Sequence, residues 1–549
     1  LDGDVEGLSR NGTFIGQHIC TPMQGAAVQI NAYNFPVWGM LEKFAPAFLA
    51  GVPSIVKPAT ATSYVTEACV RMMVESGLLP DGAVQLVIGG VGDLLDRLGA
   101  QDSLAFTGSA ATALKLRGHR GMMANAVRFT AEQDSLNASL LGPDVTPDTP
   151  EFDLFVKEVT REMTAKAGQK CTAIRRIIAP DANVGDVIDA IAARLAKITV
   201  GDPRDEATRM GALVSLSQQA DVRSKAAKIG AEARLAFGGE LAFPGADKGA
   251  FVAPHLFHCE DPDAAKAVHE EEAFGPVSTV MGYRDLTHGL ALANRGGGSL
   301  VMSLITHDPM VARETALRSA AWHGRIYIND RTSMKEATGH GAPLPHMTHG
   351  GPGRAGGGEE LGGIRAVKHY MQRTAIQGSP DMIASVGGVW TKGAAETEAP
   401  AHPFTRTFNE VTIGETIHTA ARTITLEDIE TFAHFTGDTF YAHMDEDAAQ
   451  ANPFFPGRVA HGYLLLSFAA GLFVSPDPGP VLANTGLNSL SFQKPVSPGD
   501  SISVRLVVKR KTRRTEEYGE VRWDVTLTNQ DGDQVATYEL LTMNEYERR

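Results

Sequence analysis

The residues with the clearest chemical potential in this sequence are a cysteine, a carboxylate and a carboxamide. Cys171 closes a Gly-Gln-Lys-Cys motif, Glu132 follows Thr-Ala, and Asn34 precedes Phe-Pro. A thiolate attacks a carbonyl carbon, a carboxylate takes a proton from water, and an amide N–H holds an oxyanion. If the fold brings them together, these three side chains predict covalent acyl chemistry. On residue types alone, a buried structural cysteine remains the alternative.

A second candidate group lies toward the carboxyl terminus. Asp438 precedes His443 by five residues, and Gly462 follows an Ala-His pair at the start of an apolar segment. An aspartate and a histidine can deprotonate one water, while an N–H at a helix start can polarise a thioester carbonyl. This pattern predicts water addition to an activated double bond. The alternative is that Asp438 caps a turn and His443 is a satisfied polar residue.

Alternating strands and helices are expected to position the first group. The apolar runs predict a mainly parallel sheet with helices on both faces, and ligands beyond the carboxyl ends of its strands. The alternation of strands and helices resumes at residues 152–329. The Gly-, Pro- and His-rich residues 339–363 predict a long ordered loop around an active site. The strands are expected at residues 26–30, 54–58, 84–88 and 104–107, and helices at residues 41–50, 63–76 and 152–167.

The pattern changes after residue 374. Residues 376–402 show little periodicity and are expected to be a linker. Beyond them, one long apolar helix and alternating strands with an Asp-Gly hairpin turn predict a separate α+β domain. Its helices are expected at residues 426–435 and 463–473, and its strands at residues 501–509, 520–529 and 534–543.

Composition restricts the class of protein. With 549 residues, two or three domains are expected, and 43% hydrophobic and 21% charged residues are typical of a soluble globular protein. The net charge of -14 argues against nucleic acid as the main partner. Four scattered cysteines without CxxC spacing favour reduced thiols in a cytoplasmic protein, with no metal site. No apolar run is long enough for a membrane span.

Residues 13–375 resemble the aldehyde dehydrogenase superfamily. Its motifs occur in family order: Asn-x-Pro, Lys-Pro, Phe-Thr-Gly-Ser, Gly-Gln-x-Cys and Glu-Glu-Ala-Phe-Gly-Pro. The resemblance implies that Cys171 is the nucleophile, that Asn34 and the Cys171 N–H hold the oxyanion, and that Glu132 activates the hydrolytic water. It also implies cofactor contacts with the ribose groups and the pyrophosphate. Those residues are Lys57, Glu272, Phe274 and Ser109.

The sequence also departs from that family. Thr60 stands where NAD-preferring members often have a glutamate, so NADP is expected rather than NAD. Glu132-Gln133-Asp134 replaces the usual Glu-Leu-Gly around the base, which indicates a divergent branch. The chain does not begin with methionine, and few residues precede Asn34. An N-terminally truncated dehydrogenase fold is therefore expected.

Residues 403–549 resemble the MaoC-like (R)-specific enoyl-CoA hydratases, which have a hot-dog fold. Asp438, His443 and Gly462 match, but Phe440 and Tyr441 replace Asn and Pro in the family motif. The resemblance implies an acyl-CoA substrate, and the altered loop indicates a non-standard one. A nearby basic run is either a solvated hairpin or a binding site for the phosphates of coenzyme A. Its members are Lys509, Arg510, Lys511, Arg513 and Arg514.

The order of the two domains is similar to the bifunctional ring-opening enzymes of the aerobic phenylacetyl-CoA pathway. That resemblance implies hydrolysis of oxepin-CoA, then NADP-dependent oxidation of the semialdehyde to 3-oxo-5,6-dehydrosuberyl-CoA. The alternatives are a general aldehyde dehydrogenase fused to a straight-chain enoyl-CoA hydratase, and an inactive scaffold or fragment. Both families usually assemble, so a homo-oligomer is expected. The expected parts are 1–131 (cofactor-binding), 132–375 (catalytic), 376–402 (linker) and 403–549 (hydratase).

Overall fold

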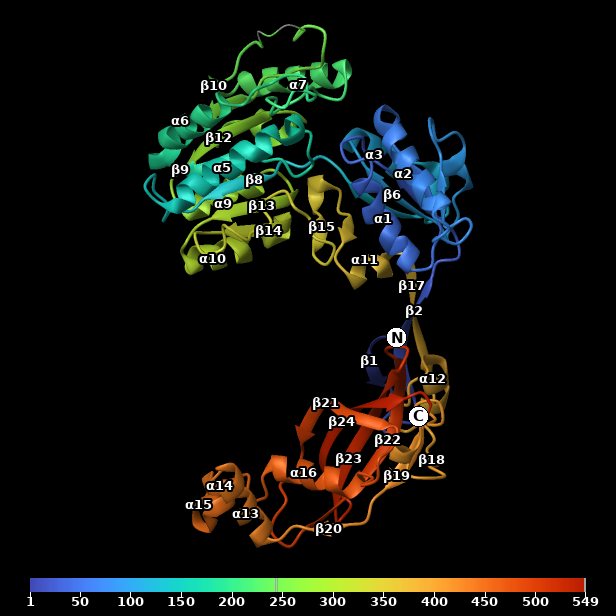
Figure 1. The fold of residues 1–549 in the computed structure, drawn as a ribbon. Coiled ribbons are helices and arrows are strands. Elements are labelled where there is room, and N and C mark those ends of the chain that lie inside the picture. The colour runs from blue at the N-terminus through green and yellow to red at the C-terminus, as the bar shows by residue number, and fades with distance from the viewer. Residues whose placement is uncertain (242, 244, 548–549) are drawn as a thin grey trace. The chain divides into compact units, whose positions relative to one another are not determined.

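The chain forms two compact units in a computed structural model that describes residues 1–241, 243 and 245–547. The larger unit is Thr21–Gln372, and the smaller one combines Leu1–Cys20 with Arg373–Arg549 (Figure 1). Within the described residues, no helix has both the length and the apolar character that crossing a membrane requires.

The first sheet of the larger unit is wholly parallel, with strand order β5-β4-β3-β6-β7. Helices α1 and α2 cover one face through Phe44 and Val70, while α3 and α4 cover the other through Leu116 and Met122. The expected strands and helices of this region are present, and the strand ending at Glu132 is additional. The elements are β3 (Ala27–Ile30), α1 (Trp38–Leu49), β4 (Ser54–Lys57), η1 (Thr60–Thr62), α2 (Ser63–Glu75), β5 (Val84–Leu86), η2 (Leu94–Arg97), β6 (Ser103–Thr107), α3 (Ala110–Arg117), α4 (Arg120–Ala124) and β7 (Arg128–Glu132).

The second sheet has the order β10-β11-β12-β9-β8-β13-β14, parallel except for β10. Helices α5 and α6 bury one face, and α7, α9 and α10 bury the other (Figure 1). The elements are β8 (Ala138–Leu141), α5 (Pro150–Thr164), η3 (Ala165–Gly168), β9 (Arg176–Pro180), η4 (Asp181–Asn183), α6 (Val184–Leu195), α7 (Leu216–Gly230), β10 (Arg234–Phe237), β11 (His255–Cys259), α8 (Ala267–Glu270), β12 (Val277–Tyr283), α9 (Leu286–Asn294), β13 (Ser299–Ile305), α10 (Pro309–Ser319), η5 (Ala320–Trp322), β14 (His323–Asn329), β15 (Thr348–Gly350), η6 (Gly353–Ala355), β16 (Glu359–Leu361) and α11 (Ile364–His369).

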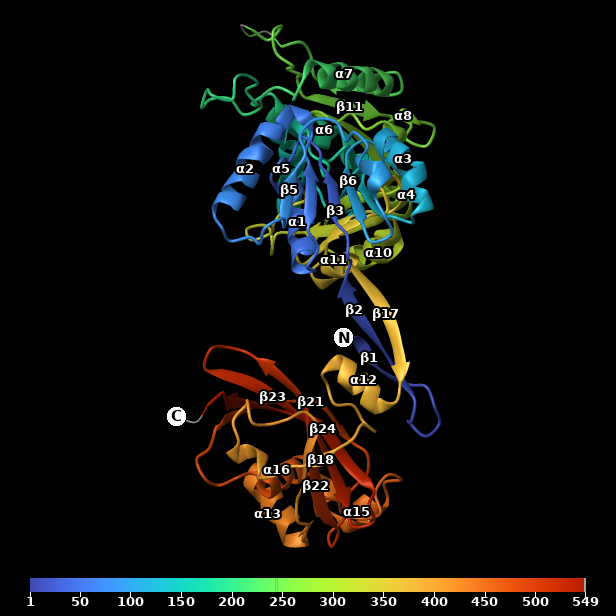
Figure 2. The same ribbon diagram turned by 90° about the vertical axis from the view of Figure 1, so that its right-hand side faces the viewer.

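The smaller unit has one long sheet, antiparallel except for the β18–β19 pair, with helix α16 packed against β22 (Figure 2). Trp523 and Phe473 lie in its apolar core. This is the expected hot-dog arrangement, with an additional long strand, β21, at the sheet edge. The elements are β18 (Thr397–Glu398), η7 (Pro403–Thr405), β19 (Glu415–His418), β20 (Arg422–Thr423), α13 (Leu426–Thr436), α14 (Tyr441–Met444), α15 (Glu446–Gln450), α16 (Gly462–Phe473), β21 (Val481–Phe492), β22 (Ser501–Arg513), β23 (Tyr518–Asn529) and β24 (Gln534–Glu545).

The segment expected to be a linker, residues 376–402, is structured. It contains the end of β17 (Met371–Gly378), which joins β1 (Asp2–Gly7) and β2 (Ile15–Pro22) in a three-stranded sheet, and helix α12 (Pro380–Gly387). Trp390 is buried and packs with Val507 of β22. Weak sequence periodicity here reflects short elements that pack on neighbours distant in sequence.

Candidate active sites

A tight turn after helix α5 carries Cys171. The helix ends at Thr164, and Lys166 and Gly168 then adopt left-handed backbone angles, with φ of 54° and 70°. A Cβ on Gly168 would lie 2.1 Å from the carbonyl oxygen of Gly275. Only glycine fits both the angle and this close approach. The Gly-Gln-Lys-Cys motif thus forms a turn after the helix, which ends at Thr164, three residues before the expected end.

The structure brings the three residues of the first group together. Asn34, Glu132 and Cys171 line one cavity of about 290 Å³. Asn34 follows β3 and its Nδ2 donates a hydrogen bond to the Gln169 carbonyl oxygen at 3.2 Å. Glu132 ends β7 and is buried. The carboxyl ends of the parallel strands and the cysteine turn therefore meet at one cavity, as the sheet pattern predicts.

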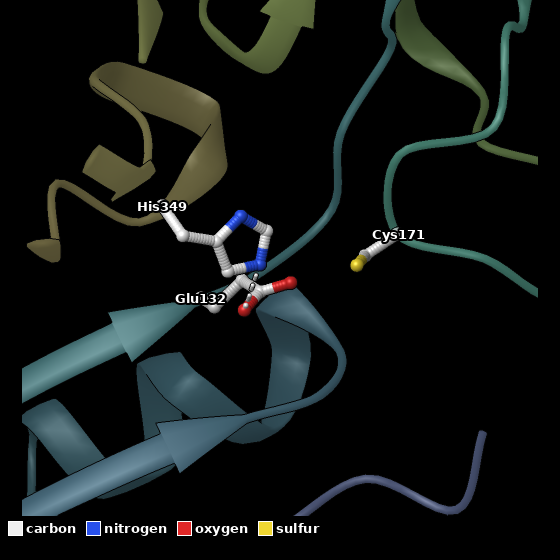
Figure 3. A group of neighbouring side chains, drawn as sticks. All are labelled: Glu132, Cys171 and His349. Atoms are coloured by element: carbon white, nitrogen blue, oxygen red, sulfur yellow. Dashed lines mark ion pairs between the residues drawn. The ribbon is translucent and has the colours of Figure 1, made fainter. Parts of the chain in front are cut away.

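His349 is a fourth member of this site that no motif indicated. It lies on β15, within residues 339–363, and its Nε2 is 3.3 Å from Oε2 of Glu132. Figure 3 shows the imidazole beside the carboxylate, with Sγ of Cys171 directed toward both. One nitrogen, oxygen or sulfur atom from each of the three side chains lies within 4.8 Å of the corresponding atoms of the other two. The expected ordered loop around the active site thus contributes a buried titratable group.

The ionisable side chains in this cavity shift one another's pKa values. Burial raises the pKa of the Cys171 thiol well above its usual range, and the Glu132 carboxylate raises it further. Burial acts to raise the pKa of Glu132, but the charges of His349 and Lys43 and hydrogen bonds from His349 and Cys171 together lower that pKa to about 2. Glu132 is therefore a carboxylate at neutral pH, and the neighbouring thiol resists ionisation.

Two further residues missed in the sequence hold the cysteine turn in place. Asn137 donates from Nδ2 to the carbonyl oxygens of Cys171 and Ala173, at 2.7 and 3.0 Å. Buried Arg175 donates to the Gly168 carbonyl oxygen at 2.8 Å. Side-chain hydrogen bonds to buried carbonyls rigidify a loop that has no regular backbone pairing. Neither residue belongs to a motif with chemistry of its own, so residue type did not single them out.

The residues expected to hold a nicotinamide cofactor fit that group. Lys57 ends β4, Thr60 begins η1, and Ser109 caps α3 by accepting a hydrogen bond from the Thr112 N–H. Glu272 is buried, and its Oε1 has no hydrogen-bond partner in the described structure. A buried carboxylate oxygen without a partner is suited to ribose hydroxyls. Phe274 packs edge-on against Tyr33 beside Asn34.

Asp134, one of the departures from the family motif, lies at the start of α3. Its Oδ1 accepts a hydrogen bond from the Ala110 N–H at 3.0 Å. The resemblance placed a pyrophosphate contact at this helix end, where an N–H group favours an anion. The guanidinium of Arg354 lies 3.7 Å from Asp134 Oδ2 and offsets part of its charge. The divergent motif therefore introduces a carboxylate beside the cofactor region.

In the smaller unit, Asp438 and His443 also lie together. Helix α13 ends at Thr436, and Gly437, with a φ of 82°, turns the chain toward Asp438. His443 Nδ1 is 2.7 Å from the Val459 carbonyl oxygen, which leaves Nε2 available as an acceptor when Nδ1 carries the proton. His461, absent from the sequence prediction, stacks on His443 at 3.7 Å and bonds the Asp438 carbonyl oxygen through Nε2. His461 thus contacts both predicted residues, Asp438 and His443, and links them.

Gly462 begins α16, as its proposed oxyanion role requires. A Cβ at this position would lie 2.5 Å from the Phe492 ring, so a larger residue would displace that ring. The helix is twelve residues long, and the N–H groups of its first turn favour a partial negative charge on a carbonyl oxygen. This glycine is thus explained by close packing beneath the helix start.

The basic run lies at the far end of β22 from Gly462. Phe492 of β21 pairs with Ala536, which is level with Val504 of β22, and Arg513 is nine residues further along the strand. At about 3.4 Å per residue, Arg513 lies roughly 30 Å along the strand from that level, and Lys509, five residues from Val504, lies roughly 17 Å from it. Its side chains also have partners within the unit: Lys509 pairs with Glu539, Lys511 donates to Val411, and Arg514 pairs with Glu520. These contacts compete with phosphate binding.

Comparison with known sequences gives two matches along the chain. Residues 8–376 match the aldehyde dehydrogenase family model, and residues 408–529 match the MaoC-like domain model. A 3,4-dehydroadipyl-CoA semialdehyde dehydrogenase from Aromatoleum evansii is 46% identical over 355 residues, 64% of this chain and 69% of that protein. Protein MaoC from Klebsiella aerogenes is 52% identical over 320 residues, 57% of this chain and 95% of that protein.

Solved structures show the same dehydrogenase architecture. Betaine aldehyde dehydrogenase from Staphylococcus aureus in complex with NAD+ has a TM-score of 0.60 and 25% identity, covering 68% of this chain and 70% of that one. PnpE in complex with nicotinamide adenine dinucleotide also has a TM-score of 0.60, with 26% identity, covering 69% and 73%. The sequence match over residues 8–376 spans more than half of the chain. The protein therefore belongs to the aldehyde dehydrogenase family and carries a MaoC-like domain after its dehydrogenase domain.

Proposed function

We propose that this chain opens the ring of oxepin-CoA in its hot-dog domain and oxidises the resulting semialdehyde in its dehydrogenase domain. The product is 3-oxo-5,6-dehydrosuberyl-CoA, and the oxidant is NADP. The observation that carries the proposal is the presence of a Cys-Glu-Asn cavity and an Asp-His pair in one chain. A relative named for oxidation of a CoA semialdehyde supports the substrate class.

In the dehydrogenase cavity, Sγ of Cys171 attacks the aldehyde carbon, and the Asn34 amide with the Cys171 N–H holds the oxyanion. For Asn34, this requires its Nδ2 to turn from the Gln169 carbonyl toward the substrate. Bound nicotinamide supplies the hydride acceptor. Glu132 then removes a proton from the water that hydrolyses the thioester on Cys171.

In the hot-dog domain, Asp438 and Nε2 of His443 hold one water and remove its proton. Gly462 polarises the thioester carbonyl, so charge that develops on its oxygen is stabilised at the start of α16. Addition of this hydroxide to the enol ether, with return of the proton from the Asp438–His443 pair to carbon, yields a hemiacetal, which opens to an aldehyde. Because the two domains belong to one chain, the reactive aldehyde meets the dehydrogenase site at a raised local concentration.

A direct assay distinguishes the proposal from its alternatives. The full chain, supplied with oxepin-CoA and NADP, should form NADPH and an open-chain acid, whereas crotonyl-CoA should be hydrated far more slowly. Faster hydration of crotonyl-CoA would favour a straight-chain enoyl-CoA hydratase. Absence of both reactions would favour the inactive scaffold. Repeating the assay with NAD tests cofactor choice, because Thr60 offers no carboxylate to repel a 2′-phosphate. We also expect the protein to be a cytoplasmic homo-oligomer. Size-exclusion chromatography with light scattering measures its assembly state.

Cofactor affinity should depend on pH through Glu272. Burial raises the pKa of this carboxyl to about 7, so the ionised form increases as pH rises through neutrality. Because the carboxylate accepts more hydrogen bonds from ribose than the acid does, NADP should bind up to about tenfold more tightly at pH 8 than at pH 6. Fluorescence titration measures this change. The Glu272→Gln variant should bind weakly with a flat pH profile, and an unchanged profile would remove Glu272 from the cofactor site.

The basic run should have only a modest influence on the acyl-CoA substrate. Neutralising Lys509, Arg510 and Arg514 together should raise KM about two- to fivefold and weaken its dependence on salt. The effect is small because these side chains lie far along β22 and have internal partners. Steady-state kinetics of ring opening at two salt concentrations measures it. Lys225→Gln, on α7 of the larger unit, is the matched control. Equal KM values in all variants would show that the basic run is a solvated hairpin with no role in substrate binding.

A further inference from the structure

Helices α5 and α6 of the larger unit, which lie side by side (Figure 1), form the walls of a basic pocket. Its volume is about 750 Å³, and five of the residues that line it are cationic while none is acidic. Lys157 and Lys197 form no ion pair and no side-chain hydrogen bond within the described part of the chain. In a protein of net charge -14, composition alone does not explain this concentration of positive charge. The cationic residues of the α5–α6 pocket are Lys157, Arg161, Arg194, Lys197 and Arg209.

The arginines of this pocket keep hydrogen-bond donors for a ligand. Arg194 pairs with Asp153 at 2.5 Å, and both side chains are in contact with water. Arg161 lies 3.5 Å from Glu158 and is half exposed, while Arg209 donates to a backbone carbonyl oxygen at 3.1 Å. Ion pairs open to water are weak, and each guanidinium has five N–H donors. These contacts therefore leave groups that can bind a phosphate.

The pocket also has an apolar wall. Ala165, Ala190, Ala193 and Ile198 line it together with the cations. Apolar side chains favour a flat base, whereas lysine and arginine favour phosphate oxygens, arginine through paired hydrogen bonds. This combination fits a phosphorylated adenine nucleotide. The 3′-phospho-ADP part of coenzyme A is such a group, with about four negative charges near neutral pH.

The loop at residues 339–341 connects this pocket with the cavity that holds Cys171. Arg161 of the pocket packs against the loop, since a Cβ on Gly339 would lie 2.1 Å from Nη2 of Arg161. Gly341, two residues further on, lines the Cys171 cavity. The same short segment thus belongs to the surroundings of both.

The start of the cysteine turn forms a second connection. Ala165 lines the α5–α6 pocket, and the next residue, Lys166, places its Nζ 3.6 Å from the centre of the Phe35 ring. Phe35 lines the Cys171 cavity. Because the pocket and the cavity adjoin, one long molecule can place its phosphates in the first and its aldehyde in the second. A CoA semialdehyde has this form, since the pantetheine arm and the acyl chain separate its aldehyde from its nucleotide.

The residues expected to hold the nicotinamide cofactor lie elsewhere. Ser109, the expected pyrophosphate contact, caps α3 beside the first sheet. Glu272 follows α8, and Val268 of α8 packs in the same apolar cluster as Val222 of α7. Helices α5 and α6 pack in a separate cluster on the opposite face of the second sheet. The cations of the α5–α6 pocket are therefore left for a different phosphate-bearing ligand.

We propose that the α5–α6 pocket binds the 3′-phospho-ADP part of the acyl-CoA semialdehyde and so holds its aldehyde end at Cys171. The proposal rests on the CoA-linked substrate proposed above and adds the subsite that recognises it. Because the ligand and the chain as a whole are both negative, the pocket supplies the local attraction that the net charge opposes.

Lysine footprinting of the full chain, without aldehyde, tests the assignment directly. An N-hydroxysuccinimide ester acetylates exposed lysines, and mass spectrometry measures the labelling of each peptide. Saturating acetyl-CoA should lower the labelling of Lys157 and Lys197 at least threefold, because the phosphates cover their ammonium groups. Lys115, exposed on α3, is the internal reference and should be labelled equally with and without acetyl-CoA. NADP at the same concentration should leave the labelling of Lys157 and Lys197 unchanged.

Kinetics tests whether the pocket serves the dehydrogenase site. In the Lys157→Gln/Lys197→Gln variant, KM for a semialdehyde-CoA should rise at least tenfold with kcat little changed. KM for a small aldehyde without coenzyme A should stay the same, because that substrate does not reach the pocket. Lys115→Gln/Lys225→Gln is the matched control, since it removes the same charge from α3 and α7. It should leave both KM values unchanged.

Three results would overturn the proposal. The first is equal labelling of Lys157 and Lys197 with and without acetyl-CoA. The second is protection by NADP as strong as that by acetyl-CoA, which would assign the pocket to the cofactor. The third is an equal rise in KM for both aldehydes, which would indicate a structural effect of the variant. Protection of both lysines in a chain that oxidises no semialdehyde-CoA would instead contradict the proposed function and leave the ligand of the pocket as assigned.

Discussion

Cys171→Ala should abolish formation of NADPH from a semialdehyde-CoA while ring opening by the hot-dog domain continues. The thiol lines the cavity with Asn34 and Glu132, and alanine leaves no atom that can form the thioester. Loss of a nucleophile that starts a covalent pathway reduces turnover by at least about 10³-fold. Absorbance of NADPH measures the first activity, and chromatography of the accumulated aldehyde measures the second.

Cys69→Ala is a suitable control for this substitution. Cys69 is also a partly buried free cysteine, but it lies on α2, outside the residues that line the cavity. It should retain NADPH formation. If Cys171→Ala instead removed both activities in a folded chain, the two sites would not act independently. Residual NADPH formation near the original rate would show that another group carries the acyl chemistry.

Asp438→Asn or His443→Ala should stop water addition to the ring while a supplied aldehyde is still oxidised. The aspartate and the imidazole lie together beside α16, and each is needed to hold and deprotonate one water. Removing one partner of a general base typically costs about 10²- to 10⁴-fold in rate. The loss of oxepin-CoA, followed by absorbance, measures ring opening, and NADPH formation from added semialdehyde measures the other domain.

His434→Ala provides the comparison for the hydratase variants. His434 lies in the last turn of α13, close to Asp438 in sequence but exposed. Ring opening should continue in this variant. Unchanged hydration in both Asp438→Asn and His443→Ala would remove the Asp-His pair from the mechanism. Because the two sets of variants affect different activities, a mixture of Cys171→Ala and His443→Ala chains should restore the overall reaction through released aldehyde.

Local sequence was sufficient for most regular elements. The parallel sheet that carries Lys57 and Ser109 was predicted from apolar runs, because buried parallel strands read as continuous apolar segments. Prediction failed where long-range contacts determine structure. Trp390 is buried against β22 within a segment that reads as a linker. This contact leaves no pattern in the neighbouring residues.

The sequence by itself determined the family, the two-domain order and the chemical types at both sites, since Cys171, Glu132 and the Asp438-His443 pair belong to short motifs with defined spacing. Only the tertiary structure decided which other groups share those sites. His349 is separated from Glu132 by more than two hundred residues and meets it only because β15 packs beside the end of β7. The reason is physical: a motif records residues that act through their neighbours in the chain, whereas a buried charge interacts with whatever the fold places within a few ångströms.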